Sequence, residues 1–379
     1  MTDKEHYPSS THPPLPPTPE DEQFARLRLL RSRRVGIATY KRLLTEHGTA
    51  QNALAALPEV ARAAGVSGYQ ICPEGVIWSE LKAARAVGAK LVAMGDAAYP
   101  ANLADIDDAP PFLWCLGNVA LMARPMISMV GARNASSLGT RMAKALARDL
   151  GAAGFIIVSG LARGVDAAAH LASLETGTIA VQAGGVDVMY PAENTELARS
   201  IGQSGLRLSE QAMGLQPMAR HFPSRNRIIS GLSRATIVVE AAAKSGSLIT
   251  ARDALDQGRD VLAVPGHPFD ARASGCNMLL RDGATLVRSA ADVLEVLGEA
   301  TLPEKPARAT TPKKPARTLR ETAALHLQIL SRLGPSPVAE DQLIRDLSVD
   351  AAQVAPVLVD LELDGQIARQ PGGLLSKVS

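Results

Sequence analysis

Residues 126–164 read MISMVGARNASSLGTRMAKALARDLGAAGFIIVSGLARG, and this stretch decides the fold class. Two apolar runs, Met126–Val130 and Phe155–Val158, fit buried strands, and a helix is expected between them over Arg141–Ala153. A strand, a helix and a second strand in this order form a βαβ unit, in which the two strands are parallel. The stretch therefore predicts a Rossmann-like parallel sheet.

The same alternation continues to about Glu299. Further strands are expected at Thr178–Val181, Ala235–Val239, Asp260–Val264 and Thr285–Val287. Further helices are expected at Val165–Glu175, Ser247–Gln257 and Ala290–Leu297. A hydrophobic content of 46% with only 3% aromatics fits helices packed on buried parallel strands, so we expect an α/β protein with an extended Rossmann-like core.

Four of these strands are followed by small, hydroxyl-bearing or cationic residues. They are Gly131, Arg133 and Ser136 after the first strand, Ser159, Gly160 and Arg163 after the second, Gly184 after the third, and Ser245, Gly246 and Ser247 after the Ala235–Val239 strand. The carboxyl ends of parallel strands meet at one edge, where ligands bind. Glycine-rich turns alone are common in such sheets, but four of them with two arginines favour a phosphate-binding edge.

The segment Phe222–Ser233 is basic without compensating acids. No Asp or Glu lies between Gln211 and Val239, whereas Arg220, Arg225, Arg227 and Arg234 all do. Arginines beside an aromatic ring are typical of single-stranded nucleic-acid sites. Phe222 fits a core anchor equally well, and the arginines could instead form structural ion pairs, but we expect at least one of them to contact phosphate.

Bulk properties narrow the function further. The formal charge of +2 predicts no global attraction to polyanions, so a nucleic-acid site must be local. The chain contains neither GxGxxG nor GxxxxGK[ST], and we expect no cofactor. Three scattered cysteines argue against a metal or disulfide framework, and no segment is apolar enough to cross a membrane, so we expect a cytoplasmic protein without membrane insertion.

Catalytic groups are few. Asp166 and His170 are four residues apart on one helix, but a capping carboxylate and a packed or surface histidine explain them as well. Glu240 follows a strand and could be catalytic or could be the buried partner of an arginine. His221, His267 and Asp270 lack metal-ligand spacing. We therefore expect no enzyme.

Composition divides the chain into five parts. We expect a disordered proline-rich tail at 1–20, a small helical domain of SAM or helix-hairpin-helix type at 21–90, the Rossmann-like domain at 91–300, a basic proline-rich linker at 301–318 and a winged-helix-like domain at 319–379. In the last, helices are expected at Leu325–Leu333, Glu340–Leu347 and Ala351–Leu363, and a hairpin at Ile367–Val378. The third helix contains no Lys or Arg, which favours a protein contact over duplex DNA.

Several segments together resemble one family, that of DNA processing protein A (DprA, also called Smf). The matching segments are Gly131–Ser136, Ser159–Asp166, Tyr190–Asn194, Phe222–Ser233, Val239–Glu240 with Ser245–Thr250, and Ala263–Gly266. The resemblance covers most of the chain and is strongest from Tyr99 to Gly283. Val35-Gly36-Ile37 is only a partial helix-hairpin-helix loop.

The resemblance implies a homodimer that binds single-stranded DNA and helps to load RecA on it in natural transformation, while countering single-strand-binding protein. It also implies which residues line the DNA pocket, namely Arg133, Ser159, Gly160, Arg163, Phe222, Arg225, Asn226 and Arg227.

Two other classes of function stay open at this point. The first is a Rossmann-like nucleotide-processing hydrolase, similar to phosphoribohydrolases, but their PGGxGTxxE pattern is not matched around Gly184-Gly185 or Ser245–Thr250. The second is a scaffold that binds no nucleic acid. Single-stranded DNA binding without catalysis is the function that the sequence favours.

Overall fold

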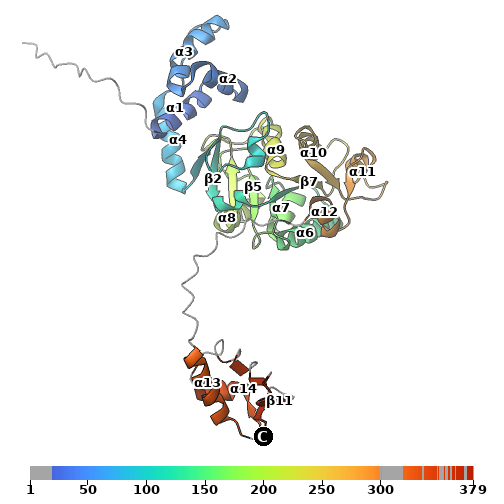
Figure 1. The fold of residues 1–379 in the computed structure, drawn as a ribbon. Helices are drawn as coiled ribbons and strands as arrows, with labels where there is room; N and C mark the ends of the chain where they lie inside the picture. The colour runs from blue at the N-terminus through green and yellow to red at the C-terminus, as the bar shows by residue number, and fades with distance from the viewer. Residues whose placement is uncertain are drawn as a thin grey trace, which may run out of the picture. The chain divides into compact units, whose positions relative to one another are not determined.

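The computed structural model describes residues 19–298 and 300 and, toward the C-terminus, residues 319–334, 337–347, 349, 354, 357, 358, 361, 362, 364–370 and 374–378. The chain divides into two compact units, residues 1–303 and 304–379 (Figure 1). Residues 1–18 of the predicted tail and the whole predicted linker, 301–318, lie outside the described residues. Helix α1 begins at Pro19, so Pro19 and Glu20 belong to a helix rather than to the tail.

A nine-stranded sheet forms the centre of the first unit, in the order β1-β2-β6-β5-β4-β3-β7-β8-β9. The strands are β1 (Lys90–Ala93), β2 (Phe112–Gly117), β3 (Met126–Val130), β4 (Ile156–Ser159), β5 (Thr178–Val181), β6 (Leu206–Ser209), β7 (Ala235–Val238), β8 (Asp260–Ala263) and β9 (Thr285–Leu286). All neighbours from β6 to β9 in this order are parallel, which confirms the predicted sheet. The sheet is nevertheless mixed, because β2 pairs antiparallel with β1 and with β6, and none of these three strands was predicted.

Successive strand residues point to opposite sides of the sheet, and each side is covered by helices (Figure 1). Ile127 and Met129 of β3 pack with one set of helices, and Met126 and Val130 pack with the other. The first set is α6 (Ser137–Ala152), α7 (Val165–Ala172) and α12 (Ala290–Leu297), and the second is α9 (His221–Leu232), α10 (Ser247–Asp256) and α11 (Ser274–Arg281). This layering leaves the carboxyl ends of the strands free to carry a site.

Four helices form the N-terminal part of this unit: α1 (Pro19–Arg31), α2 (Ile37–His47), α3 (Ala50–Ala63) and α4 (Glu74–Val87). They share a core with Phe112 and Trp114 of the antiparallel strand β2, which lies next to the edge strand β1. The Trp114 Nε1–H donates to Glu80 Oε1 at 2.7 Å, and Arg31 donates to both oxygens of Glu80 at 2.8 and 3.0 Å. A buried carboxylate therefore ties this helical part to the sheet.

The second unit contains α13 (Leu319–Arg332), α14 (Glu340–Leu347) and a three-stranded sheet in the order β10-β12-β11. Its strands are β10 (Val338–Ala339), β11 (Ile367–Gln370) and β12 (Leu374–Lys377). The predicted hairpin is confirmed by the antiparallel pairing of β11 with β12. Most of the predicted helix 351–363 lies outside the described residues.

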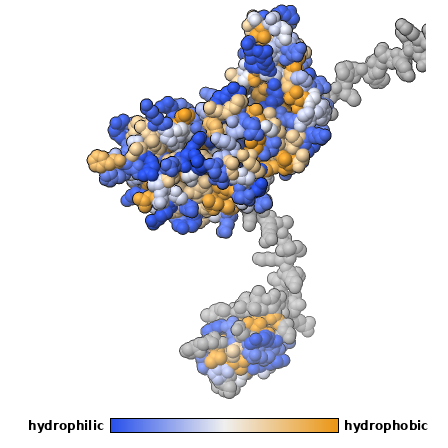
Figure 2. Space-filling view, turned by 180° about the vertical axis from the view of Figure 1, so that it is seen from behind, coloured by the Kyte–Doolittle hydropathy of each residue, from blue (hydrophilic) through white to orange (hydrophobic). Residues whose placement is uncertain are grey.

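The surface carries hydrophobic residues in small groups among hydrophilic ones on the face that Figure 2 shows. Within the described part of the chain, none of the helices combines the length and the apolar character that crossing a bilayer requires.

Candidate nucleic-acid interface

The four loops singled out in the sequence lie next to one another in space. They follow β5, β4, β3 and β7, which are consecutive neighbours in the parallel part of the sheet. The predicted convergence at one edge is therefore confirmed. Two cavities open at this edge, of about 350 and about 780 Å³.

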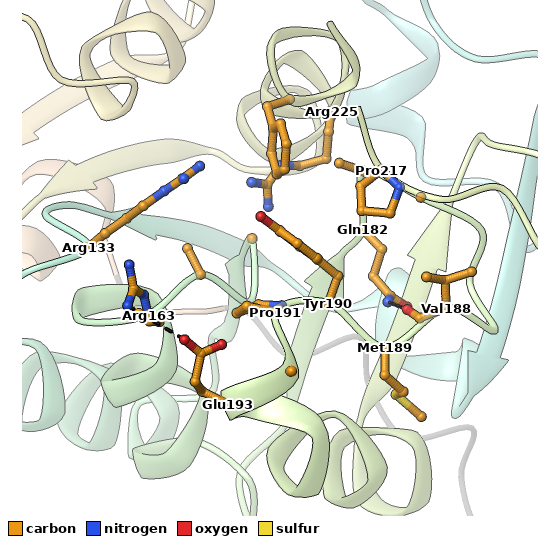
Figure 3. Close-up of a pocket in the computed structure, with 16 residues that line it drawn as sticks. Arg133, Arg163, Gln182, Val188, Met189, Tyr190, Pro191, Glu193, Pro217 and Arg225 are labelled. Atoms are coloured by element: carbon orange, nitrogen blue, oxygen red, sulfur yellow. Dashed lines mark hydrogen bonds and ion pairs between the residues drawn. The ribbon is translucent and has the colours of Figure 1, made fainter. Parts of the chain in front are cut away.

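Arg133, Phe222 and Arg225 line both cavities. The first cavity also receives Gly160, Arg163, Gly184, Tyr190 and Glu193. Figure 3 shows Arg133, Arg163 and Tyr190 extending from loops, and Arg225 from helix α9, around the same space. The second cavity also receives Gly131, Asn226, Lys244, Ser245, Gly246, Ser247 and Arg272. Because they share these three side chains and Ala162, the two cavities form one continuous surface, which we call the edge groove.

Arg225 lies buried beneath the edge groove. Its Nη1 donates to the Val181 carbonyl at 3.0 Å, and it reaches this carbonyl across Gly160, where the Cβ of any other residue would overlap with the guanidinium. Burial lowers the pKa of Arg225 to about 10, so the side chain remains a cation at neutral pH. The position of this cation depends on the glycine that follows Ser159.

Asp166 compensates part of this buried charge. Burial raises the pKa of Asp166, and Arg225 together with the N–H groups of Gly160 and Ala162 opposes that rise. These two N–H groups donate to Asp166 Oδ2 at 3.1 and 3.3 Å. The carboxylate thus holds the loop after β4 in place, as a capping residue does, and the structure favours this role over a catalytic one.

Phe222 forms the centre of an alternating set of rings and cations. The Arg133 guanidinium carbon lies 5.3 Å from the centroid of the Phe222 ring, and that of Arg225 lies 6.0 Å away. The Tyr190 ring is 5.8 Å from the Phe222 ring, centroid to centroid. A cation is attracted to the negative face of an aromatic ring, and these contacts hold the ring in place. The half-buried Phe222 is therefore a rigid platform.

The loops after β3 and β4 approach each other closely because of two glycines. Gly164 has φ of 75°, and a Cβ there would overlap with the Ala132 carbonyl oxygen. At Gly131, a Cβ would lie 2.6 Å from Val165 Cγ2. The Val165 N–H donates to the Ala132 carbonyl at 3.2 Å, which joins the two loops. This close approach brings Arg133 and Arg163 to the same cavity.

The loop after β7 forms the far side of the second cavity. Ser245 and Ser247 share a hydrogen bond of 2.6 Å between their hydroxyl oxygens, and the Asn226 side-chain amide donates to the Gly246 carbonyl at 3.4 Å. Lys244 and Arg272 are exposed beside them. In the first cavity, Arg163 pairs with Glu193 at 3.5 Å, with both side chains more than half exposed (Figure 3).

Three predicted site residues do not line the edge groove. Ser159 is fully buried and donates its hydroxyl to the Met129 carbonyl at 2.6 Å. Ser136 donates its hydroxyl to Glu240. Arg227 points to a different environment, where Nε lies 3.0 Å from Asp108 and Nη2 lies 2.6 Å from Glu210. Asp108 and Glu210 both lie outside the segment from Gln211 to Val239 that contains no Asp or Glu, and Glu210 directly precedes it. The composition of that segment alone therefore did not predict these two partners.

The residues of the edge groove that were not predicted as site residues include Gln182, Tyr190, Lys244 and Arg272. Tyr190 was part of a matching segment but was assigned no role, although it contributes a half-exposed ring. An exposed lysine between the Ala235–Val239 strand and Ser245 was a usable signal for Lys244. Nothing in the sequence connected Arg272 to this edge.

The groups considered for catalysis take part in structural contacts. Burial lowers the pKa of His170 to about 3, and its Nδ1 lies 2.7 Å from the Thr178 hydroxyl. Glu240 accepts hydrogen bonds from Ser136 and forms no ion pair with an arginine within the described residues, so the predicted role as the buried partner of an arginine is wrong. No group of three or more His, Cys, Asp or Glu side chains in the described ranges is placed to hold a metal ion.

Three family models match the chain. The model described as DNA recombination-mediator protein A matches residues 90–298, the DprA-like N-terminal HHH domain matches 20–83, and the DprA winged helix domain matches 313–373. Among curated proteins, DNA processing protein DprA of Streptococcus pneumoniae is 47% identical over 201 residues, which cover 52% of this chain and 71% of the relative. Protein Smf of Escherichia coli is 36% identical over 280 residues, covering 73% and 74%.

Two solved structures are also similar. The X-ray structure of DprA from Streptococcus pneumoniae aligns with a TM-score of 0.62 at 35% identity and covers 72% of this chain and 97% of that one. A structure of DNA processing protein A from Helicobacter pylori, described as giving insight into that protein's single-stranded DNA binding mode, aligns with a TM-score of 0.51 at 30% identity and covers 55% and 95%.

Proposed function

The chain belongs to the DNA recombination-mediator protein A (DprA) family, and from this premise we propose that it binds single-stranded DNA in the edge groove as a non-catalytic recombination mediator. The protein similar to it from Helicobacter pylori has a described single-stranded DNA binding mode, and this is the activity that the edge groove fits by its chemistry.

The observation that carries the proposal is that the guanidinium carbons of Arg133 and Arg225 lie 5.3 and 6.0 Å from the centroid of the Phe222 ring. A flexible strand presents phosphates and unpaired bases alternately, so a groove that binds it without sequence preference needs cations for the first and ring faces for the second. Arg133, Arg163, Arg225, Lys244 and Arg272 supply cations, whereas Phe222 and Tyr190 supply rings.

The remaining predicted residues shape the edge groove or support its loops in this proposal. Gly131, Gly160, Gly184 and Gly246 let the DNA or a neighbouring loop come close, while Asn226, Ser245 and Ser247 offer polar side chains in the second cavity. Ser136, Ser159 and Arg227 support the loops and α9 without touching DNA.

No bond is broken in this function. Asp166 and His170 are engaged by the fold, and Glu240 binds a helix end, so we propose no hydrolase activity and no cofactor. In the same proposal, a homodimer of the chain delivers the bound strand to RecA in natural transformation and displaces single-strand-binding protein. A RecA filament assay on DNA coated with that protein tests this step, and an unchanged filament formation rate would contradict it.

The DNA site is tested with Arg133→Ala, and Arg148→Ala is the matched control because Arg148 is exposed and pairs only with its neighbour Asp149 among the described residues. Fluorescence anisotropy with a labelled oligo-dT at several salt concentrations measures the affinity. Losing one charged hydrogen bond of about 1.5–3 kcal/mol weakens binding roughly tenfold or more, and the slope of log K against log salt becomes less negative by about 0.7. Equal affinities of the two variants would refute the proposed site.

A further inference from the structure

The loops that follow β3 and β7 are joined by a side chain. In the strand order, β4 lies on one side of β3 and β7 lies on the other, so the chain changes direction between β3 and β7. In doubly wound sheets, this switch point is where ligands enter between the carboxyl ends of the strands. Glu240 follows β7, and Ser136 precedes α6 on the loop after β3, so a contact between the two spans the switch point.

The Glu240 carboxylate takes the place of an anion at the start of α6. Its Oε2 accepts from the Ser136 N–H at 2.9 Å, and its Oε1 accepts from the Ser136 hydroxyl at 2.5 Å. The same hydroxyl accepts from the Gly139 N–H at 3.0 Å, which caps the helix. A Cβ at position 139 would overlap with the carboxylate, so the glycine makes the room that Glu240 fills. A negative group is favoured there because the first N–H groups of a helix are unpaired.

These contacts fix the end of the loop that carries Arg133. The loop from Gly131 to Ser136 is joined to its neighbour by the Val165 N–H at its start and is held by Glu240 at its end. Arg133 lies between these two anchors and is exposed, with its guanidinium over Phe222. Without the second anchor, the loop would order only when DNA binds, and that ordering would reduce the affinity.

We propose that Glu240 is a positioning residue for the DNA site: its carboxylate joins the loops after β3 and β7 and thereby holds Arg133 over Phe222. The inference rests on the proposed DNA binding. Counting charges alone would predict that a carboxylate near the edge groove weakens the binding of a polyanion. In this inference Glu240 strengthens that binding instead.

Four variants test this role in the full chain: Glu240→Ala, Glu240→Gln, Arg133→Ala and the double variant. Glu175→Ala removes an exposed carboxylate elsewhere and serves as the charge control. We expect Glu240→Ala to weaken oligo-dT binding about tenfold and to reduce the salt slope by about 0.7, as Arg133→Ala does. Glutamine keeps an acceptor for the Ser136 N–H, so Glu240→Gln should bind within about twofold of the unmodified chain.

The double variant separates positioning from other effects. If Glu240 acts through Arg133, the double variant binds as weakly as Arg133→Ala alone, because the two losses are not additive. Additive losses, or a Glu240→Ala chain that remains folded by circular dichroism and binds normally, would overturn the inference. Tighter binding by both Glu240 variants would also overturn it, since the carboxylate would then only repel DNA. Should the unmodified chain not bind oligo-dT at all, the proposed function itself fails.

Discussion

Gly160→Ala tests how the edge groove positions its buried cation. The new methyl group would overlap with the Arg225 guanidinium, and this side chain must move because the three atoms nearest to the methyl group all belong to it. Arg225 would then lose its 3.0 Å hydrogen bond to the Val181 carbonyl, at a cost of about 1.5–3 kcal/mol for a bond from a charged donor. Alanine recovers about 0.4–1 kcal/mol by restricting the unfolded chain, so the free energy of unfolding should fall by about 1–2 kcal/mol.

The effect on DNA binding should exceed the effect on stability. With Arg225 displaced, one phosphate contact is lost, so the affinity for oligo-dT should fall roughly 10- to 150-fold. Urea unfolding and fluorescence anisotropy measure the two quantities. Gly75→Ala is the control, because a Cβ at this exposed position of α4 meets nothing within 4 Å. Normal binding by Gly160→Ala would show that Arg225 does not depend on this glycine, and the account of the site would be wrong.

Three further predictions follow from other contacts. Phe222→Leu should weaken oligo-dT binding by the stacking energy of one base, about 1–3 kcal/mol, without changing the slope of log K against log salt. Phe222→Tyr should bind normally. A changed slope in the leucine variant would contradict a stacking role. Glu80→Ala leaves Arg31 and the Trp114 N–H without their buried acceptor, so the free energy of unfolding measured in urea should fall by about 3 kcal/mol or more. Glu74→Ala breaks only an exposed pair with Arg28 and should cost less than about 1 kcal/mol. Equal losses in the two variants would refute this prediction. Burial and the neighbours Asp108 and Asp256 raise the pKa of Asp253 to about 6, so the fold stabilises the protonated form, and this stability is lost as the pH rises from the pKa of the unfolded chain through 6. Asp253→Asn should therefore raise Tm at pH 8 but not at pH 4. A variant whose Tm at pH 8 equals that of the unmodified chain would contradict this.

Apart from β6, the parallel core could be predicted from sequence because each of its other strands is a short apolar run followed by a helix. The run at Met126–Val130 begins and ends where β3 does, and the glycine-rich loops after it have recognisable compositions. Strands β1 and β2 lack this signal, because β2 pairs with β1 and with β6 through antiparallel contacts such as Trp114 with Ser209. Neither strand therefore belongs to a βαβ unit, whose alternation of strand and helix predicted most of the other strands.

Site residues were harder to predict because neighbouring residues at the end of a strand point in opposite directions. Ser159 and Gly160 were both expected at the DNA, yet Ser159 faces the sheet and bonds to Met129, whereas Gly160 borders the cavity. A shift of one residue reverses the side on which a group lies. The sequence identifies the loop, but the exact position at which the strand ends determines which residues of the loop face the cavity.

The two arginines of α9 show why charge counts alone cannot locate a polyanion site. Arg225 and Arg227 lie two residues apart in a segment without acids, yet the fold brings Glu210 and Asp108 to Arg227 and gives Arg225 a backbone carbonyl and an aromatic ring instead. A cation whose charge is already balanced by two carboxylates gains little from a phosphate, because it must first give up those partners. Arg225 has a neutral acceptor and only one carboxylate, Asp166, acting on it at a distance, so a phosphate adds to its stabilisation. The availability of a cation therefore depends on residues more than one hundred positions away in the sequence, such as Asp108, and only the folded chain shows which arginine remains free to bind DNA.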